Sequence, residues 1–344
     1  MILTPGQLYF INEQDVTTDE RTDYYKIGIV RDSAGRNSKD RLLEHQTGNP
    51  RKLCIVETLD VPAVEAIETN LHALFARNRI FGEWMRFTKT ELEIAINKAK
   101  DLAVEMKENI KDYEIAEEFK NKKSNGKKLE SSEVSEKYHR EVLDFKGLVD
   151  ICDESIKNYK IYIQGEIERG VDVSGRANRQ QRAASKKFDE KLFESQYPEL
   201  WKEYTVIKYS IAGSFRITPV KNLNANFSLL NQEQVDSLNL FKEELISADF
   251  SLDSGLSLHE KYLGVVEINS YLKWREDIAS TKLRVMTGEH EGIEGICTWK
   301  REEKESQLLD KDKLRLEHPL EFESCEIEGS AVNVLTVFPK IATA

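Results

Sequence analysis

The first ninety residues alternate between strand-like and helix-like apolar patterns, and this order restricts the folds that the chain can adopt. Alternating polarity is typical of strands, whereas apolar residues at helical spacing are typical of a helix packed on a sheet. Polar, Gly and Pro turns separate the runs. The pattern predicts an α+β domain. Its elements, in the order strand, strand, helix, strand, helix, are Gln7–Ile11, Tyr25–Val30, Lys39–Thr47, Lys52–Leu59 and Pro62–Asn78.

A long charged helix and a lysine-rich stretch are expected to separate this domain from the rest. Residues 90–119 are strongly charged with a sparse apolar stripe, which is typical of a surface or connecting helix. Residues 120–128 contain no apolar side chain, and their Ser-Asn-Gly centre favours a flexible linker. A chain of 344 residues is also long for one core. We therefore expect a first domain at 1–97 and a helix with its linker at 98–131.

The C-terminal part contains an internal repeat. Residues 188–200 resemble residues 309–321, and in both copies a proline lies ten residues after the apolar residue that precedes an aspartate. Each copy predicts a helix, a basic strand, a turn with proline and a second strand. Two related units indicate a duplicated α+β region for binding or assembly. The expected bounds are 132–220 for the first copy, 221–262 for a connector and 263–344 for the second copy.

Charge and cysteine content restrict partners and compartment. The net charge of −11 does not favour a nucleic-acid binder, because phosphate contacts require a basic surface. Residues 1–95 carry 12 basic and 15 acidic residues, whereas residues 201–344 carry 17 and 24. The cysteines are far apart, and the sequence shows neither an export signal nor a membrane-spanning stretch. We expect a cytoplasmic protein without membrane contact, whose DNA binding uses local basic patches or a partner.

Five polar residues of the first domain are the groups needed to cleave a phosphodiester bond around one divalent metal: Tyr9, Lys26, Arg41, His45 and Glu68. Arg41 and His45 share one helix face, where a guanidinium can bind phosphate and an imidazole can move protons or hold the tyrosine. Tyr9 and Lys26 lie on neighbouring predicted strands, and an ammonium or a metal would lower the pKa of the phenol. For the helical pair alone, a solvated face without function is the commoner explanation.

Glu68 and His72 also lie four residues apart, beside the apolar stripe of the second helix. A carboxylate at the edge of a buried face can hold Mg²⁺ (or Mn²⁺), because such an ion keeps most of its waters and needs few protein ligands. An ordinary intrahelical polar pair is the alternative. The sequence therefore indicates Glu68 as the metal ligand only in combination with the other four residues.

Taken in order, these residues resemble the GIY-YIG nuclease superfamily. Tyr9 follows Gln7-Leu8, Lys26 is followed by Ile-Gly, and Arg41 and His45 precede Glu68 at the family's spacing. The resemblance is strongest to the branch with a Lys-Ile-Gly second motif and a Gly-Glu-Trp after the metal-site helix, and it covers roughly residues 5–92. It implies a three-stranded antiparallel sheet with flanking helices that hydrolyses DNA with one divalent ion.

The resemblance also implies roles and shows departures. Tyr9 would act as the base or align the attacking water, Arg41 would contact the scissile phosphate, and His45 would assist proton transfer. Lys26 stands where the second motif tyrosine is usual, with Tyr25 adjacent, and Glu83 stands where many members have asparagine. Tyr25, His72 and Glu83 are therefore secondary candidates.

A basic cluster lies in the first C-terminal copy. It could bind phosphates, although a solvated strand edge is an equally good explanation. Its members are Arg176, Arg179, Arg182, Lys186 and Lys187.

The main hypothesis is a metal-dependent DNA endonuclease whose acidic C-terminal region targets, assembles or restrains it, as in phage defence or a mobile element. A homo-oligomer or a regulatory protein would then be a partner. The alternative is an inactive nucleic-acid or protein interaction module, favoured by Lys26 and the net acidity. A third possibility is RNA as the substrate.

Overall fold

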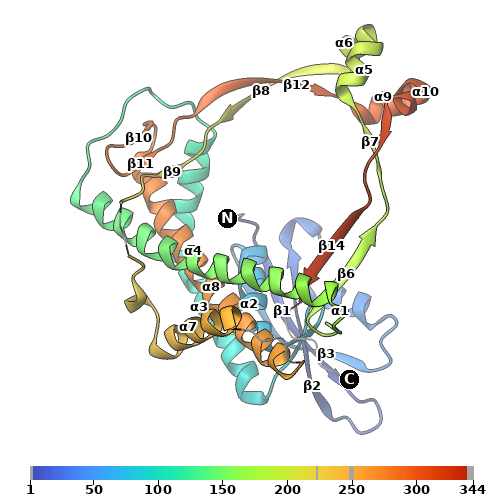
Figure 1. Ribbon diagram of the computed structural model, residues 1–344, viewed down its shortest axis with the longest axis vertical. Coiled ribbons are helices and arrows are strands. Elements are labelled where there is room, and N and C mark those ends of the chain that lie inside the picture. Colours follow the sequence, from blue (N-terminus) through green and yellow to red (C-terminus); the bar gives the residue numbers. More distant parts are fainter. Residues whose placement is uncertain (1–2, 222–223, 248–251, 339–344) are drawn as a thin grey trace.

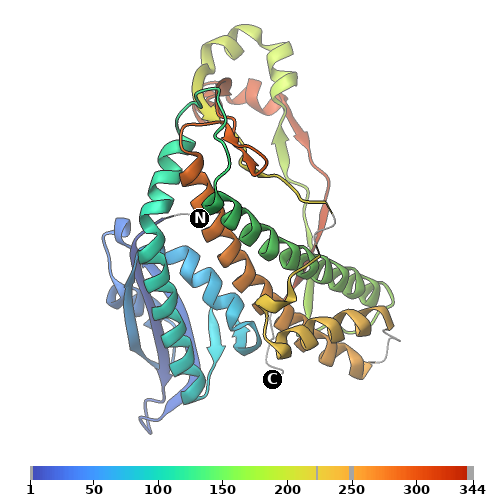
Figure 2. The ribbon, with the colours of Figure 1, turned by 90° about the vertical axis from the view of Figure 1, so that its left-hand side faces the viewer.

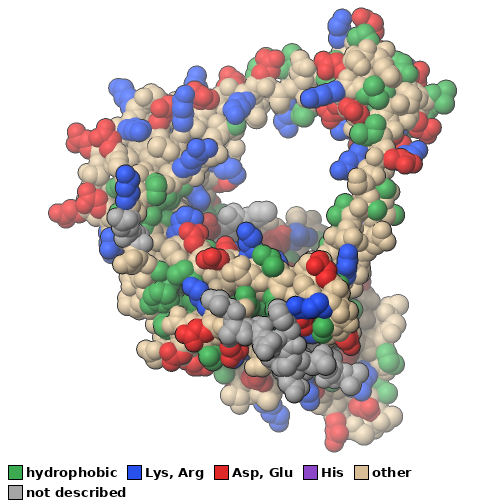
Figure 3. Space-filling model, viewed as in Figure 1, with side chains coloured by type: hydrophobic (Ala, Val, Ile, Leu, Met, Phe, Trp, Pro, Cys, Tyr) green, Lys and Arg blue, Asp and Glu red, His purple; other side chains and the backbone are tan. Residues whose placement is uncertain are grey.

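The computed structural model describes residues 3–221, 224–247 and 252–338. It is the expected α+β protein, and it has three parts (Figures 1 and 2). The head contains β1–β5 with α1 and α2. The hub contains the long helices α3, α4 and α8 with α7. The arch contains the ribbons and short helices that rise from the hub and return to it, and a space-filling view leaves an opening between the arch and the hub (Figure 3).

The head is built on one antiparallel sheet with strand order β3-β1-β2-β5-β4. It has two strands more than the three that we expected, because the segment after α2 folds back and pairs with β2: Trp84 lies opposite Lys26 and Arg86 opposite Tyr24. The strands are β1 (Gly6–Gln14), β2 (Arg21–Arg31), β3 (Lys52–Val61), β4 (Arg79–Phe81) and β5 (Trp84–Arg86).

Helices cover both faces of this sheet. α1 (Ser38–Gln46) begins with a capping box between Asn37 and Asp40 and lies over one face. α2 (Val64–Leu74) lies over the other, where Ile67 and Leu71 are fully buried. A short 3-10 turn (Ala76–Asn78) then leads into β4. The two faces are therefore distinct, with the main core under α2 and a smaller one under α1.

The hub joins the head to the arch. Its helices are α3 (Lys89–Lys120), α4 (Glu133–Glu168), α7 (Gln232–Ser247) and α8 (Leu252–Thr287). The apolar side of α3 packs on the head, and Trp274 of α8 enters the same core. The Trp274 indole donates a hydrogen bond to Glu105 of α3 (2.8 Å), and Tyr113 of α3 donates to Asp277 of α8 (2.9 Å). None of the helices in the described ranges has the length and hydrophobicity needed to cross a membrane.

The lysine-rich segment after α3, which we predicted as a flexible linker, is held by backbone hydrogen bonds. The amide of Ser124 donates to the carbonyl of Arg301 (3.0 Å), and that of Asn125 donates to Glu289 (2.9 Å). Leu129 forms a bridge with Ile293. The two residues in each of these contacts are 160 or more positions apart in the sequence, so local sequence patterns could not indicate the contacts.

The arch consists of antiparallel two-stranded ribbons joined by a pair of helical hairpins. In every ribbon, one strand comes from each copy of the repeat: β6 with β14, β7 with β13 and β8 with β12. A three-stranded sheet, β10-β11-β9, forms one foot. The remaining elements are β6 (Ala177–Arg182), β7 (Lys186–Phe188), α5 (Glu190–Gln196), α6 (Pro198–Tyr204), β8 (Thr205–Ala212), β9 (Arg216–Ile217), a 3-10 turn (Phe227–Leu229), β10 (Gly292–Ile293), β11 (Cys297–Thr298), β12 (Glu302–Leu309), α9 (Lys311–Glu317), α10 (Pro319–Ser324), β13 (Glu326–Glu328) and β14 (Val332–Val337).

The sequence repeat corresponds to equivalent positions in the arch. Asp189 caps α5 as Asp310 caps α9, and Pro198 begins α6 as Pro319 begins α10. The four helices enclose a small core that includes Phe193, Leu314 and Phe322 from both copies. Because each strand of the three ribbons pairs with the other copy, neither copy forms a ribbon by itself.

Candidate active site

Tyr9 lies in the middle of β1, on the sheet face covered by α1. It pairs directly with Gly28 of β2, and its side chain is 1% exposed. A methyl group on Gly28 would lie 2.5 Å from the Tyr9 hydroxyl oxygen and 2.7 Å from the ring Cζ. The phenol ring therefore occupies the space that any larger residue at position 28 would fill. The glycine of the Lys-Ile-Gly motif thus determines where the Tyr9 hydroxyl lies.

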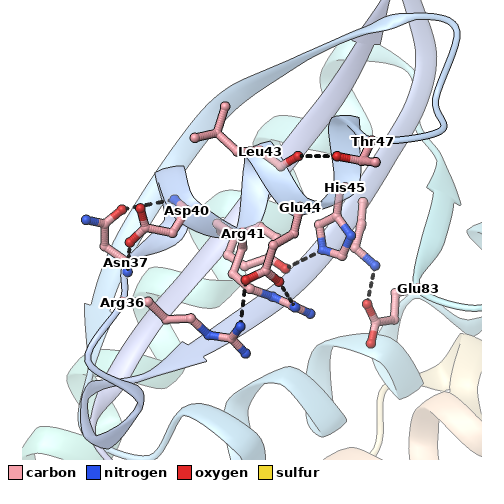
Figure 4. A network of polar contacts seen from close by, with 11 residues as sticks. Arg36, Asn37, Asp40, Arg41, Leu43, Glu44, His45, Thr47 and Glu83 are labelled. Carbon is pink, nitrogen blue, oxygen red and sulfur yellow. Dashed lines mark hydrogen bonds and ion pairs between the residues drawn. The ribbon is translucent and has the colours of Figure 1, made fainter.

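α1 brings Arg41 and His45 to this hydroxyl. Leu42 packs into the small core around Tyr9, which orients the helix. One turn apart on the same side, His45 Nε2 lies 3.2 Å from the Tyr9 hydroxyl oxygen, and Arg41 lies near enough to lower the pKa of that phenol. Figure 4 shows Arg41, Glu44 and His45 on the side of α1 that faces Glu83. The structure thus brings together the two helical residues and the tyrosine that the sequence indicated.

Glu44 links two arginines beside the tyrosine. Its carboxylate forms an ion pair with Arg41 and a second one with Arg36, at 2.7 Å from Arg36 Nη1. The Arg41 Nε atom is buried and has no hydrogen-bond partner among the described residues. A phosphate oxygen is the kind of acceptor that could satisfy this donor. Glu44 and Arg36 were not predicted, although the spacing of three residues between Arg41 and Glu44 is a helical contact signal.

Burial determines the protonation of the tyrosine and the histidine. Burial raises the pKa of Tyr9, and the hydrogen bond and charge of Arg41 offset this only partly. We expected a neighbouring cation to lower this pKa, but burial has the larger effect. Burial, with the positive charges of Lys26 and Arg41, lowers the pKa of His45. Near neutral pH the phenol is therefore protonated and the imidazole neutral, so that an unprotonated Nε2 can accept the phenol hydrogen.

Lys26 is on the same sheet face as Tyr9 but has a different partner. Its side chain lies opposite Ile11 of β1 and is 8% exposed overall. Its ammonium forms an ion pair with Glu83, which lies in the turn between β4 and β5. The pair joins the two departures from the family motif, because the lysine replaces the tyrosine and the glutamate replaces the asparagine. The positive charge of Lys26 lowers the pKa of His45 and also that of Glu68.

Tyr25 and His72 lie in the main core instead. Side chains alternate between the faces of a strand, so Tyr25 points away from Tyr9, and its ring centroid is 6.1 Å from that of Phe87. Tyr25 therefore cannot replace the second motif tyrosine at the Tyr9 hydroxyl. His72 is 8% exposed, and its Nε2 donates to the carbonyl of Ile27 at 3.1 Å. This contact indicates a structural role for His72.

Glu68 reaches the site from α2. It lines a pocket of about 410 Å³ with His72, Arg79 and Glu83 of the head and Val266 of α8. Burial, followed by repulsion from Glu83, raises the pKa of the Glu68 carboxyl to about 7, and Lys26 offsets part of this. The charge of Glu68 also acts on Tyr9. Arg79 was missed by the sequence analysis, because β4, the strand that it begins, has only three residues and shows no recognisable pattern.

The donor set fits a divalent ion that keeps most of its water. Glu68 has no hydrogen bond or ion pair among the described residues, and its raised pKa shows that a nearby positive charge would stabilise the carboxylate. Glu83 provides a second carboxylate in the same pocket. No group of three or more metal-binding side chains occurs within residues 3–221, 224–247 and 252–338. Two carboxylates are the kind of ligand set that Mg²⁺ or Mn²⁺ takes, and the binding of either ion stays a prediction.

The predicted basic cluster of the first copy is not a single surface. Arg176 is 3% exposed, and its Nη2 donates to the carbonyl of Asp172 at 2.8 Å, so it cannot contact phosphate at the surface. Arg179 and Arg182 are exposed on β6 but lie three residues apart, and their side chains point to opposite faces of the ribbon. Lys186 and Lys187 of β7 are divided in the same way. Consecutive basic residues in a strand do not share one face.

A domain-family comparison matches the head. The T5orf172 domain model matches residues 6–100, and this family is associated with nuclease-type domains of phage origin. The match ends at Lys100 within α3, so most of the hub and the whole arch lie outside it. Neither the curated proteins nor the solved structures contain a significant match to the chain. The head is therefore similar to nuclease-type domains, and its place in the GIY-YIG superfamily stays a prediction.

Proposed function

We propose that the protein is a metal-dependent DNA endonuclease that hydrolyses phosphodiester bonds in the head with a single divalent ion. The observation that carries this proposal is the convergence on one hydroxyl. His45 contacts the Tyr9 hydroxyl, and the charges of Arg41, Glu83 and Glu68 all act on the pKa of the same phenol. The T5orf172 match supports a nuclease-type head and DNA as its partner.

Each residue has a role that its surroundings support. Glu68 would hold Mg²⁺ or Mn²⁺, and the bound ion would supply positive charge for the phosphate and for the developing leaving group. Arg41 binds a phosphate oxygen when its guanidinium turns from Glu44 toward the substrate. Tyr9 orients the attacking water through its hydroxyl, and the neutral His45 accepts a proton from it. The ion pair with Lys26 would hold the Glu83 carboxylate in place at the wall of the pocket.

Plasmid nicking with Mg²⁺ or Mn²⁺ tests these roles. We expect Arg41→Ala and Glu68→Gln to lower the cleavage rate by about 100-fold or more, because each removes charge stabilisation of the transition state. Tyr9→Phe keeps the ring over Gly28 but removes the hydroxyl, so it should lose activity without losing stability. The same assay with RNA determines which nucleic acid is the substrate.

Glu65→Gln is the matched control. Glu65 lies on α2 one turn before Glu68 and pairs with Arg31, so this variant changes the same chemical group on the same helix. It should cut DNA as the wild type does. Equal rates for Glu65→Gln and Glu68→Gln, or cleavage that persists after metal chelation, would exclude the proposed site.

A second candidate function is a head that binds nucleic acid or protein without cleaving it. Two ion pairs favour it, because Glu44 neutralises Arg41 and Glu83 neutralises Lys26. In this case the wild type and all four variants are equally inactive with either metal. The hub and arch then carry targeting or assembly in both candidate functions, which fits a role in phage defence or a mobile element.

A further inference from the structure

One foot of the arch contains a groove with four basic residues among its ten lining residues. Its volume is about 630 Å³, and it lies where β8, β9, β11 and β12 meet the end of α3. The lining residue Glu302 is paired with Lys300 at 2.7 Å. The basic residues of the lining are Lys120, Arg216, Lys300 and Lys304.

The groove is formed by a close backbone crossing. A methyl group on Gly213 would lie 2.3 Å from the carbonyl oxygen of Lys300. Arg216 is paired with Thr298 in the adjoining sheet, which places a guanidinium and a hydroxyl side by side at the rim. The arrangement of these groups is therefore set by the backbone, although their side chains are exposed.

The basic surface continues along one face of the β8/β12 ribbon. Lys304 lies opposite Ser210, and Lys208 lies opposite Ser306, so both lysines share a face with the Ala212–Glu302 pair that lines the groove. The other face carries Ile207, Tyr209 and Glu305 instead. Lys208 and Lys304 are exposed. Both lysines of the ribbon therefore lie on one face, which also carries Glu302 and the exposed pair Val206 and Leu308.

The lysine-rich segment after α3 is attached at the same place. The hydrogen bonds of Ser124 and Asn125 to the chain around Arg301 hold this segment beside the start of β12. Lys123 lies close enough to Glu302 to lower the pKa of that carboxyl, together with Lys300 and Lys304. Lys and Arg side chains gather over this part of the molecule (Figure 3). We define the cationic track by its members, which are Lys120, Lys123, Lys127, Lys128, Lys208, Arg216, Lys300 and Lys304.

We propose that the cationic track binds the sugar–phosphate backbone of DNA, and this proposal rests on DNA being the substrate of the head. Lys123, Lys208 and Lys304 have no ion pair among the described residues, so their charge is available to phosphates. A two-stranded ribbon with both faces open has the width that the major groove accepts. Lysine and arginine contacts with phosphates carry no sequence information, so we expect the binding to be independent of sequence.

α3 connects the cationic track to the head and sets the distance between them. This helix packs on the head through residues such as Leu92 and Met106, and its last residue, Lys120, lines the groove. A helix rises about 1.5 Å per residue, so Lys120 lies roughly 10 Å beyond Tyr113, the last residue of α3 in that core. DNA held on the track is thus kept within reach of the head without occupying its site.

The test uses the full-length protein with Glu68→Gln, in the presence of a chelator, so that binding is measured without cleavage. Fluorescence anisotropy with a labelled DNA duplex is recorded over a range of salt concentrations. The track variant combines Lys208→Glu, Lys300→Glu and Lys304→Glu. The control variant combines Lys107→Glu, Lys111→Glu and Lys137→Glu, which are exposed lysines on α3 and α4 and give the same change of net charge.

We expect the track variant to lose about tenfold or more in affinity at low salt, and the slope of log K against log salt to become shallower by about 2 to 3, since three phosphate contacts are removed. The control variant should keep the slope of the parent. Equal losses in both variants, an unchanged slope in the track variant, or no DNA binding by the parent would each overturn the proposal. Binding that follows the track, with no cleavage by the wild type, would reject the nuclease function alone.

Discussion

The head and the arch each depend on a glycine at a close approach, but the approach serves different purposes. In the head, Gly28 leaves room for one side chain, and the Tyr9 ring is then held by contacts on every side. In the arch, Gly213 leaves room for a backbone crossing, and the cationic side chains that line the groove beside it stay exposed. Fixed geometry is what catalysis requires, whereas exposed charge is sufficient for binding a phosphate backbone.

The largest expected effect comes from adding one methyl group in the head. In Gly28→Ala, the new Cβ overlaps the Tyr9 hydroxyl and ring, so the tyrosine must move. A displacement of about 1 Å costs on the order of 100-fold in rate. Nicking assays should show this loss, while anisotropy shows unchanged DNA affinity. A wild-type cleavage rate in Gly28→Ala would show that cleavage does not depend on the position of Tyr9.

A smaller effect is expected from the equivalent change in the arch. Gly213→Ala places a Cβ against the Lys300 carbonyl, and Gly329→Ala places one 2.6 Å from the Ser185 carbonyl at the matching point of the other leg. Each should cost about 1 to 3 kcal/mol locally. Hydrogen exchange should show faster opening of β8/β12 in the first and of β7/β13 in the second.

Only the Gly213 variant should also weaken DNA binding, because the cationic track lies on that leg alone. Equal losses of affinity in the two glycine variants would contradict the assignment of the track to one leg.

The pH dependence of the head follows from Glu68. The folded protein raises the pKa of this carboxyl from 4.5 to about 7, so the folded state binds a proton that the unfolded state has released over that interval. Its contribution to stability is present below the lower pKa and is lost as the pH rises through about 7. Cleavage should show the opposite trend and increase through the same interval, because the ionised carboxylate binds the metal.

Glu68→Gln should therefore reduce the loss of thermal stability between about pH 5 and about pH 8. Part of the slope should persist, because burial raises the pKa of Glu267 in α8 to about 7 as well. A variant with the wild-type slope would show that Glu68 is ionised in the folded protein throughout this interval.

The smallest effect is expected at Gly147 of the hub, which leaves room neither for a side chain nor for a backbone crossing. A methyl group on Gly147 of α4 would lie 3.6 Å from the nearest atom, which is an ordinary contact. Gly147→Ala should stabilise the protein by up to about 1 kcal/mol, because glycine is a poor helix former. A raised melting temperature with unchanged cleavage would confirm this, whereas a lowered one would show that the glycine has a function in packing.

The sequence was sufficient for features that repeat at short range. Helical spacing placed Arg41 and His45 on one face, and the α+β class was confirmed. The sequence was not sufficient to predict which residues these side chains contact. The two additional strands of the sheet are three residues each, and the Lys26–Glu83 ion pair joins residues far apart in the chain. The division of the basic cluster between two ribbon faces follows from strand geometry, but only once the strands themselves are known.

The repeat shows the same limit at larger scale. Its matching aspartates and prolines predicted two similar units, and they do begin equivalent helices. Nothing in the repeat itself indicates that each unit pairs its strands with the other unit. This arrangement depends on contacts between residues 205–212 and 302–309 and on those between 177–182 and 332–337, which no local pattern records.

Mutual pairing of the two units has a consequence for biosynthesis. The ascending leg leaves the ribosome long before its complement exists, since Ala177 pairs with Val337. Until then β6 and β7 are single strands with open edges, which other chains can join. Closing the loop therefore requires two distant stretches of one polypeptide to meet, and such long-range pairing slows folding.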